Sequence, residues 1–482
     1  MRPTTSAPSL ARVIPVTVLL GALLSVSVVI PGSAVTLAWG PSRTVDSGQP
    51  AQGSPAITRD DTATLVLWES ATGSALTSSS TDAGMTWSPA RLLGSENYGA
   101  SSPMLVSTGA TTVAAWVPYE NTSARIQSAT TIDGGVTWGT PALISDYGGV
   151  TNTSLTEGGG TVVAAWLKSS RIAVNVSADG GLTWDGPRQL SDLGDANGPV
   201  VAVKGDTIVV SWARADGPRL NVEATVSLDA GATWSTVTRL SAAAMTSYEQ
   251  TAAIDDSGAI VVGWWTQDET AVYSARSIDG GLTWSSAQRN SAPALIAQLP
   301  QLQAVDGALI MLWLAFETDQ YWAMVSRSTD GGQTWNAPVA LSAPADAPIL
   351  AEIVADGLTV VATWAQPSGD GTLLRSTRSH DGGITWTTPE DLWSDPLTGR
   401  ASVVVVDGTA AIAAPITGAQ TSLEHRVRTL GIAFDVVNPG GPRPELAESG
   451  PADVSALAIV ALLLVLAGTG IVLRRRPGRM SA

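Results

Sequence analysis

An eight-residue motif recurs seven times along the 482-residue chain. One copy, S-T-D-G-G-Q-T-W, spans residues 328–335, and the other copies keep its aspartate, its fifth-position glycine, its threonine and its tryptophan. The central aspartates are Asp82, Asp133, Asp179, Asp229, Asp279, Asp330 and Asp381, at steps of 51, 46, 50, 50, 51 and 51 residues. A period near fifty residues indicates one supersecondary unit that is stacked many times.

Each unit has the pattern of four short antiparallel strands. In residues 161–184 an apolar run ends at Trp166, an alternating strand follows over 171–176, and the D-G-G turn leads into 182–184. A further strand precedes residue 161, which gives the content of one propeller blade. The sequence therefore predicts an all-β protein, a β-propeller of four-stranded antiparallel blades.

A second tryptophan keeps the same phase on the second predicted strand of each unit. We interpret both tryptophan series as packing between blades, because a large aromatic residue at a fixed place in every copy is core. The second series is Trp68, Trp116, Trp166, Trp212, Trp264, Trp313 and Trp364.

The two ends of the repeat region predict how the ring closes. Residues 401–416 form a further pair of strands in phase, but this eighth unit has lost both the strand tryptophan and the octapeptide. Its fourth strand is found near the N-terminus, where L-A-W-G-P-S around Trp39 resembles V-T-W-G-T-P around Trp138. We expect eight blades closed by strands from both ends, with a seven-bladed ring as the alternative.

The octapeptide has a mechanical interpretation. Its aspartate can accept backbone N–H groups of its own turn, glycine at the fourth or fifth position allows positive φ, and the hydroxyls join the two arms. Seven catalytic copies around a ring would share no substrate. We therefore interpret the seven aspartates as structural residues.

This pattern resembles the Asp-box, or BNR repeat, of bacterial sialidases and other propellers. The resemblance covers residues 35 to about 437, and it implies boxes at the turn between the third and fourth strands, away from any active centre. Sialidases of this type use three arginines, a tyrosine nucleophile paired with a glutamate, and an aspartic acid. The chain lacks the Phe/Tyr-Arg-Ile-Pro motif of those enzymes.

Three residues are weak catalytic candidates, and no residue is carried over as catalytic. Tyr248 and Glu249 are adjacent on the predicted loop after the fourth box, and Arg400 is the only arginine in the loops that join one blade to the next. Arg276, Arg327 and similar arginines directly precede a box and should lie at the opposite end of the blades.

The chain ends predict export and anchoring. Residues 1–34 have the layout of a signal peptide, 438–453 form a Pro/Gly linker, 454–473 are 20 residues without a charge, and 474–482 are a basic cytoplasmic tail. The linker holds Leu446, Ala447, Glu448, Ser449 and Gly450, which resemble the LAxTG-type sorting signal of high-GC Gram-positive bacteria. We expect a cell-surface protein that is anchored to the wall by sortase or, alternatively, to the membrane by its transmembrane segment alone.

Composition excludes several classes of site. The chain has no cysteine and 2 histidines, so disulfides, thiolate metal sites and a Ser-His-Asp triad are poorly supplied. Residues 35–449 hold 20 lysines and arginines against 41 aspartates and glutamates, which argues against nucleic acid as a partner.

Several acidic residues are expected on the loops of the ligand face. We interpret them as a solvated rim and predict no metal or cofactor, with calcium or a cationic sugar as the alternative. They are Asp146, Asp192, Asp268, Glu317, Asp319 and Asp395.

The leading functional prediction is an anchored propeller that binds an extracellular glycan or protein and does no chemistry. The alternatives are an extracellular glycoside hydrolase of the exo-α-sialidase type and a structural spacer.

Overall fold

The computed structural model describes residues 38–45, 51–94, 100–120, 123–146, 148–192, 195–318, 320–368, 371–393, 397, 399–417 and 423–431. The chain divides into two units, Met1–Ile432 and Ala433–Ala482, and every described residue belongs to the first. The described part is almost entirely β, with one short 3-10 helix, η1 (Pro344–Asp346).

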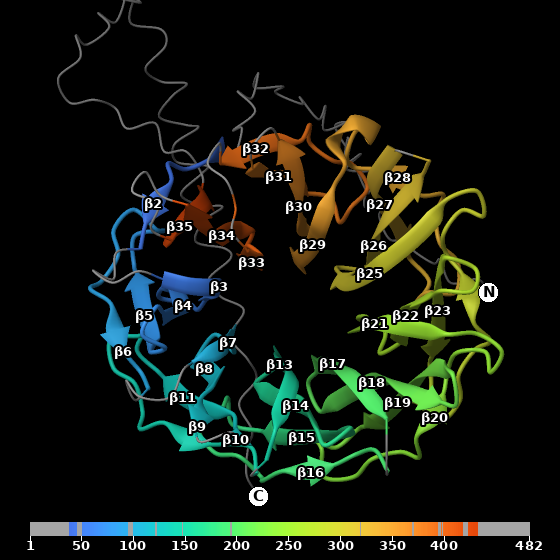
Figure 1. The fold of residues 1–482 in the computed structure, drawn as a ribbon, viewed down its shortest axis with the longest axis horizontal. Helices are drawn as coiled ribbons and strands as arrows, with labels where there is room; N and C mark the ends of the chain where they lie inside the picture. The colour runs from blue at the N-terminus through green and yellow to red at the C-terminus, as the bar shows by residue number, and fades with distance from the viewer. Residues whose placement is uncertain are drawn as a thin grey trace, which may run out of the picture. The chain divides into compact units, whose positions relative to one another are not determined.

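Eight antiparallel sheets are arranged as the blades of a ring (Figure 1). The strands of blades 1 to 4 lie in chain order from the ring axis outward. Blade 1 contains β3 (Ala51–Arg59), β4 (Thr64–Ser70), β5 (Ala75–Ser80) and β6 (Arg91–Leu92), and blade 2 contains β7 (Ser101–Ser107), β8 (Thr112–Val117), β11 (Gln127–Thr131) and β12 (Ala142–Leu143). Blade 3 contains β13 (Val150–Gly158), β14 (Thr161–Lys168), β15 (Arg171–Ser177) and β16 (Arg188–Gln189), and blade 4 contains β17 (Ala196–Lys204), β18 (Thr207–Asp216), β19 (Arg219–Ser227) and β20 (Thr238–Arg239). A separate hairpin, β9 (Tyr119–Glu120) with β10 (Ser123–Ala124), belongs to blade 2.

Blades 5 to 8 continue the ring. Blade 5 contains β21 (Ser247–Ile254), β22 (Ile260–Thr266), β23 (Ala271–Ser277) and β24 (Gln288–Arg289), and blade 6 contains β25 (Ile296–Val305), β26 (Ala308–Glu317), β27 (Gln320–Ser328) and β28 (Val339–Ala340). Blade 7 contains β29 (Ile349–Asp356), β30 (Thr359–Ser368), β31 (Gly371–Ser379) and β32 (Glu390–Trp393). Blade 8 contains β33 (Ser402–Val406), β34 (Thr409–Thr417) and β35 (Leu423–Gly431), and it is completed by β1 (Ala38–Trp39) and β2 (Arg43–Thr44). The predicted eight-bladed all-β propeller is confirmed.

The two ends of the propeller meet in blade 8. β1 pairs with β35 through Ala38↔Gly431 and Trp39↔Leu430, and β2 pairs with the same strand through Arg43↔Val427 and Thr44↔Arg426. The N-terminal strands therefore cover the outer edge of a sheet built from the last strands, as predicted. The seven-bladed alternative is wrong.

The fourth strand of blades 1 to 7 lies later than predicted. Residues 182–184 were expected to form it in blade 3, but the strand is Arg188–Gln189. The reason is local, because the backbone N–H and the hydroxyl of Thr183 both donate to Asp179 and hold these residues in the turn. Only two residues remain to pair as a fourth strand in blades 1 to 6, and four in blade 7.

Eight buried clusters among the described residues fill the interfaces between neighbouring blades. In seven of them a fully buried strand tryptophan and a partly buried box tryptophan from one blade pack against the preceding blade. The predicted packing between blades is confirmed. In the eighth, between blades 7 and 8, Pro415 occupies the tryptophan position, and Trp393 and Trp39 supply the aromatic rings instead.

The box is a turn held by its own side chains. In the copy around Asp330, one carboxylate oxygen accepts the Ser328 hydroxyl (2.8 Å) and the Thr334 N–H (2.8 Å), and the other accepts the Thr334 hydroxyl (2.6 Å). The Ser328 oxygen in turn accepts the Gly332 N–H (2.9 Å). The same four bonds occur in all seven boxes, so each aspartate is occupied within its own turn.

The fifth-position glycine joins the box to the neighbouring blade. A Cβ added to any of the seven would lie 2.2–2.8 Å from a side chain of the preceding blade, closer than real contacts allow. All seven also have positive φ, between 79° and 89°. The fourth position is left-handed as well, but it tolerates Ala83 (φ 57°) and Ala230 (φ 52°). The box therefore fixes both its own hairpin and the spacing between blades.

This close contact predicts a stability difference between two glycines. Gly181→Ala (φ 86°) would place a methyl group 2.2 Å from Val113, whereas Gly258→Ala, at a φ of 83°, would meet nothing within 4 Å. The control should lose about 1–2 kcal/mol from left-handed strain alone, and Gly181→Ala about 1–3 kcal/mol more from overpacking. Chemical unfolding of both variants measures the difference in the free energy of unfolding. Equal losses of stability would show that the interface accommodates the methyl group without a loss of free energy.

No helix in the described residues is long and apolar enough to cross a membrane. The predicted signal peptide at 1–34, the linker at 438–453 with its sorting-like motif at 446–450, the apolar segment at 454–473 and the basic tail all lie outside the described residues.

Candidate functional site

The two faces of the ring differ in what they repeat. The turns between third and fourth strands carry the boxes, and we call this side the box face. The opposite side, where one blade's fourth strand leads to the next blade's first strand, is called the loop face. Arg276 and Arg327 lie on the box face as expected, where they donate to backbone carbonyls of the following box, Asp330 (2.8 Å) and Gly382 (2.8 Å).

A bulge interrupts the innermost strand of seven blades near the loop face. In each case the pairing with the second strand shifts register, and one residue at the shift has positive φ. The residues are Gly53 (69°), Ser102 (54°), Asn152 (47°), Gly198 (60°), Glu249 (53°), Leu299 (56°) and Leu350 (51°). Five of the seven are not glycine, and such strain is concentrated at functional sites.

Arg400 takes the equivalent place in blade 8. Ser402 is the first residue of β33 that pairs with the second strand of its blade, and its partner is Ala413. Glu352 has the same place in β29, because it is the first residue that pairs with the second strand after the bulge, and its partner is Thr363. Arg400 stands two residues before Ser402, and Leu350 two residues before Glu352. Arg400 therefore continues the series of bulge positions into blade 8, where its guanidinium group lies on the loop face.

Side chains connect the innermost strands of neighbouring blades. Gln301 of β25 accepts the Ile353 N–H (3.0 Å) and donates to the Ala351 carbonyl (2.8 Å) of β29. The Thr251 hydroxyl accepts the Leu302 N–H at 2.9 Å in the same way. These bonds satisfy backbone groups at the free edge of the inner strands and hold the loop face rigid.

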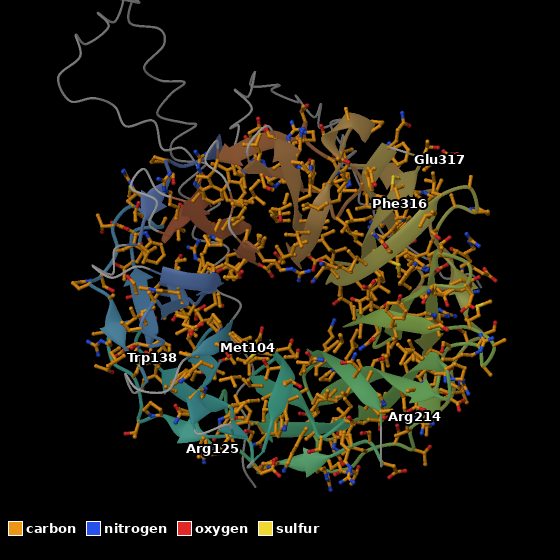
Figure 2. All side chains as sticks on the ribbon, in the orientation of Figure 1. Met104, Arg125, Trp138, Arg214, Phe316 and Glu317 are labelled. Carbon is orange, nitrogen blue, oxygen red and sulfur yellow. The ribbon has the colours of Figure 1, made fainter. Side chains whose placement is uncertain are left out.

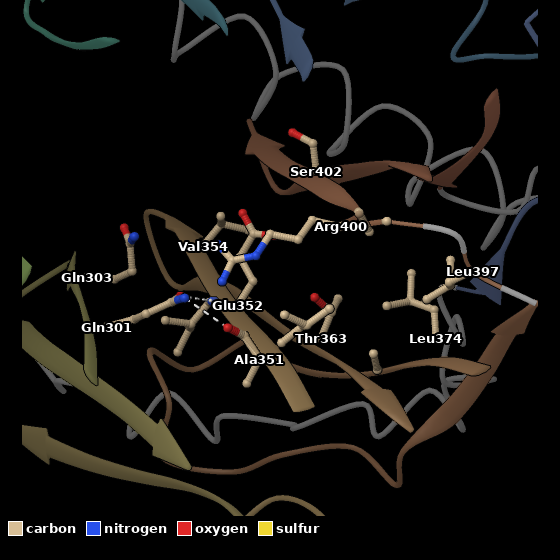
Figure 3. A pocket seen from close by; sticks show the side chains of 15 residues that line it. Gln301, Gln303, Ala351, Glu352, Val354, Thr363, Leu374, Leu397, Arg400 and Ser402 are labelled. Atoms are coloured by element: carbon tan, nitrogen blue, oxygen red, sulfur yellow. Dashed lines mark hydrogen bonds between the residues drawn. The ribbon is translucent and has the colours of Figure 1, made fainter. Parts of the chain in front are cut away.

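A pocket of about 240 Å³ lies at the bulges of blades 6, 7 and 8. Figure 3 shows the Arg400 side chain extending toward Glu352, with Gln301 bonded to β29 beside them. Burial raises the pKa of Glu352 to about 7, and the positive charge of Arg400 opposes the rise. The volume is below the range of about 300–1,000 Å³ of most small-molecule sites, so this pocket fits a single substituent of a ligand.

A larger pocket of about 460 Å³ lies at the bulges of blades 3, 4 and 5. Its polar lining comes from Asn152, Thr153, Asn197, Tyr248, Glu249 and Gln250. Tyr248 and Glu249 were predicted to lie on a loop, but they belong to strand β21, because pairing with β22 resumes across the bulge. This correction places them on a rigid element.

The surroundings of Tyr248 do not lower the pKa of its hydroxyl group. Burial and, to a lesser degree, the Glu249 carboxylate raise the pKa of Tyr248. Burial also raises the pKa of Glu249, against the effect of a hydrogen bond from the Leu299 backbone. A nucleophilic tyrosine needs a lowered pKa or a bonded base, and in the described structure no hydrogen bond joins these two side chains.

The structure does not bring the three weak catalytic candidates together. Tyr248 and Glu249 line the larger pocket, whereas Arg400 lines the smaller one and its backbone N–H is bonded to Ser54 (2.9 Å). Among the described residues that line these two pockets, Arg400 is the only arginine. A cluster of three arginines is therefore not formed in either pocket.

The acidic residues of the loop face are dispersed. Asp146 pairs with Lys168, and Asp268 accepts the Thr246 N–H and lies 3.7 Å from Arg219. In the part of the chain that the structure describes, no three His, Asp or Glu side chains come together as a metal site would require. Asp319 and Asp395 lie outside that part.

Comparison with known proteins places the chain in a family. The model of the BNR repeat-like domain matches residues 25–260 and 195–398, which together cover more than half of the chain. The chain belongs to the BNR repeat-like domain family. A comparison with curated proteins gives no match.

Solved structures similar to this BNR-repeat propeller include two sialidases and a lyase. Trypanosoma rangeli sialidase is 16% identical, with 60% of this chain and 55% of that chain covered and a TM-score of 0.37. The Hadza microbial sialidase Hz136 is 17% identical over 64% and 73%, with a TM-score of 0.38. A PL25 ulvan lyase is 10% identical over 81% and 96%, with a TM-score of 0.46. The chain thus spans about half the length of the Trypanosoma rangeli sialidase.

Sequence reasoning missed Glu352 and Gln301 of the BNR-repeat propeller. Both stand two residues after a left-handed bulge residue, a position that becomes recognisable only once the register of the inner strands is known. Arg400 was found because it is a charged residue in a loop that is otherwise without arginine.

The raised pKa of Glu352 predicts a pH-dependent stability. A carboxyl whose pKa rises on folding from 4.5 to about 7 stabilises the fold fully below 4.5 and loses that contribution as pH rises through 7. Glu352→Gln should therefore be more stable than the wild type at pH 8 by on the order of 1–2 kcal/mol, with no advantage at pH 4.5. Urea unfolding across this range measures the difference, and a difference that is constant with pH would contradict the assignment.

Proposed function

We propose that this BNR-repeat propeller is a non-catalytic module that binds a glycan on its loop face. The observation that carries the proposal is the separation of Tyr248 and Glu249 from Arg400 into two pockets. A hydrolase needs its nucleophile, base and charged anchor around one reacting bond, whereas a binding surface gains from spaced contacts.

The lining of the pockets favours a glycan over a protein ligand. The larger pocket presents the exposed amides of Asn152 and Asn197 beside one aromatic ring, and the smaller presents Arg400 and Gln303. Amide and guanidinium groups on rigid strands supply the directed donors and acceptors that hydroxyl-rich ligands require. A flat protein partner would need a broader apolar centre.

A sialidase-like hydrolase is the second candidate, because Tyr248 and Glu249 line the pocket of suitable size. Only this pair supports it, and the raised pKa of the tyrosine weakens it.

A binding and turnover experiment separates the two functions. We expect the purified protein to bind members of a glycan array and to leave a fluorogenic sialoside and a panel of other glycosides intact. Arg400→Ala should weaken glycan binding about tenfold or more, because it removes a charged donor, whereas Arg188→Ala on the box face should not. Turnover that is lost in Tyr248→Phe would establish the hydrolase instead, and binding to surface proteins without any glycan would overturn the proposal.

We also propose that the protein is exported and held at the cell surface through residues 446–450 and 454–473. Deletion of 446–450 should release the protein from the wall fraction or leave it extractable by detergent. Unchanged covalent attachment to the wall would contradict a role for sortase.

A further inference from the structure

Aromatic residues that do not belong to the repeat gather on the loop face of blades 5 and 6. Five of them are Tyr248, Trp265, Phe316, Tyr321 and Trp322, and we call these residues the aromatic surface. The Tyr248 and Trp265 rings meet edge to face at 4.7 Å, and the Phe316 and Tyr321 rings stack at 5.5 Å. All five side chains are partly exposed, Tyr321 the most at 38%.

Strand register places the two tryptophans at the same interface between blades. Trp265 pairs with Val272, and Trp322 pairs with Ala315. Directly paired residues share a face of their sheet, and Val272 and Ala315 both belong to the buried cluster between blades 5 and 6. Trp265 and Trp322 therefore flank that cluster at its loop-face end, one from each blade.

The repeat itself shows that the fold does not need these rings. The residue that follows the strand tryptophan is Trp265 in blade 5, but in the other box-bearing blades it is Glu69, Val117, Leu167, Ala213, Leu314 or Ala365. Trp322 stands two residues before the residue that pairs with the strand tryptophan of its blade. In the other box-bearing blades the residues at this place are Ser74, Arg125, Arg171, Asn221, Ala271 and Leu373. At each position the other six box-bearing blades pack without an aromatic side chain, so the fold does not require the rings of blades 5 and 6.

The surface adjoins the larger pocket and is bordered by carboxylates. Tyr248 both lines that pocket and contacts Trp265. Glu249 and Glu317 are exposed and directly follow Tyr248 and Phe316 in the chain, Asp268 is exposed three residues after Trp265, and Figure 2 shows Glu317 next to Phe316 on blade 6. The nearby Arg219 and Arg289 are engaged by Asp268 and Glu269. Carboxylates at the border disfavour a polyanion but accept hydrogen bonds from hydroxyl groups.

We propose that the aromatic surface binds the sugar rings of an uncharged polysaccharide, which extends across blades 5 and 6 from the larger pocket. The apolar faces of the sugar rings stack on Trp265 and Trp322, and their hydroxyls donate to Glu249 and Glu317. The inference rests on the proposed function, since it names the class of glycan and the surface that binds it.

Affinity electrophoresis of the protein through gels that contain a soluble β-glucan, α-mannan, arabinan or, as a polyanion, hyaluronan tests the proposal. We expect retardation by at least one uncharged polysaccharide, and a loss of about tenfold or more in affinity for Trp265→Ala and for Trp322→Ala. The matched control is Leu167→Ala, at the position of Trp265 in blade 3, which should bind as the wild type does. Trp322→Phe keeps a ring and should restore most of the affinity, which separates stacking from a folding defect.

The outcomes distinguish this inference from the proposed function. If an uncharged polysaccharide retards both alanine variants as strongly as the wild type, the role proposed for the aromatic surface is overturned, but glycan binding by the protein still holds. Retardation by hyaluronan alone would overturn the choice of an uncharged ligand. Absence of binding to every glycan, on the gels and on the array, would overturn both.

Discussion

The ring depends on the contact that each blade makes with the blade before it. A buried strand tryptophan enters the preceding blade's apolar face, and the box glycine lies so close to the same blade that no Cβ fits between them. Dispersion and apolar burial act only over such short distances. Because seven of the eight blades repeat the contact, small changes in its geometry would accumulate around the ring, and this accounts for its constancy from one repeat to the next.

The repeat made the architecture predictable. The fifty-residue period, the tryptophans in phase and the motif around Trp39 were enough to predict eight blades and their closure, because each feature reports a contact that recurs. The place of the fourth strands was wrong, since the hydrogen bonds of the box reach Thr183 and delay the strand. Trp393, which takes over packing between blades 7 and 8, could not be foreseen from a repeat that lacks it.

The candidate site was much less predictable, for the same reason. A candidate ligand-binding residue differs from the residues at the same position of the other repeats. Such a difference alone does not show whether the residue has a function or is a neutral substitution. Tyr248, Glu249 and Arg400 were visible in the sequence, but the pockets that separate them depend on bulges whose register is a property of the paired strands. The aromatic residues of blades 5 and 6 become meaningful only when strand pairing brings positions such as Trp265 and Trp322 to one interface.

The meeting of the two ends in blade 8 has a consequence for biosynthesis. β1 and β2 are made among the first residues of the propeller, yet their partner β35 is made last, almost four hundred residues later. Blades 1 to 7 can form in order as the chain emerges, because each needs only its neighbour, but without blade 8 the apolar faces of blades 7 and 1 that it covers stay exposed. The final strand pairs with both ends of the propeller and closes the ring, so a chain truncated before β35 should behave as an aggregation-prone intermediate rather than as a smaller propeller.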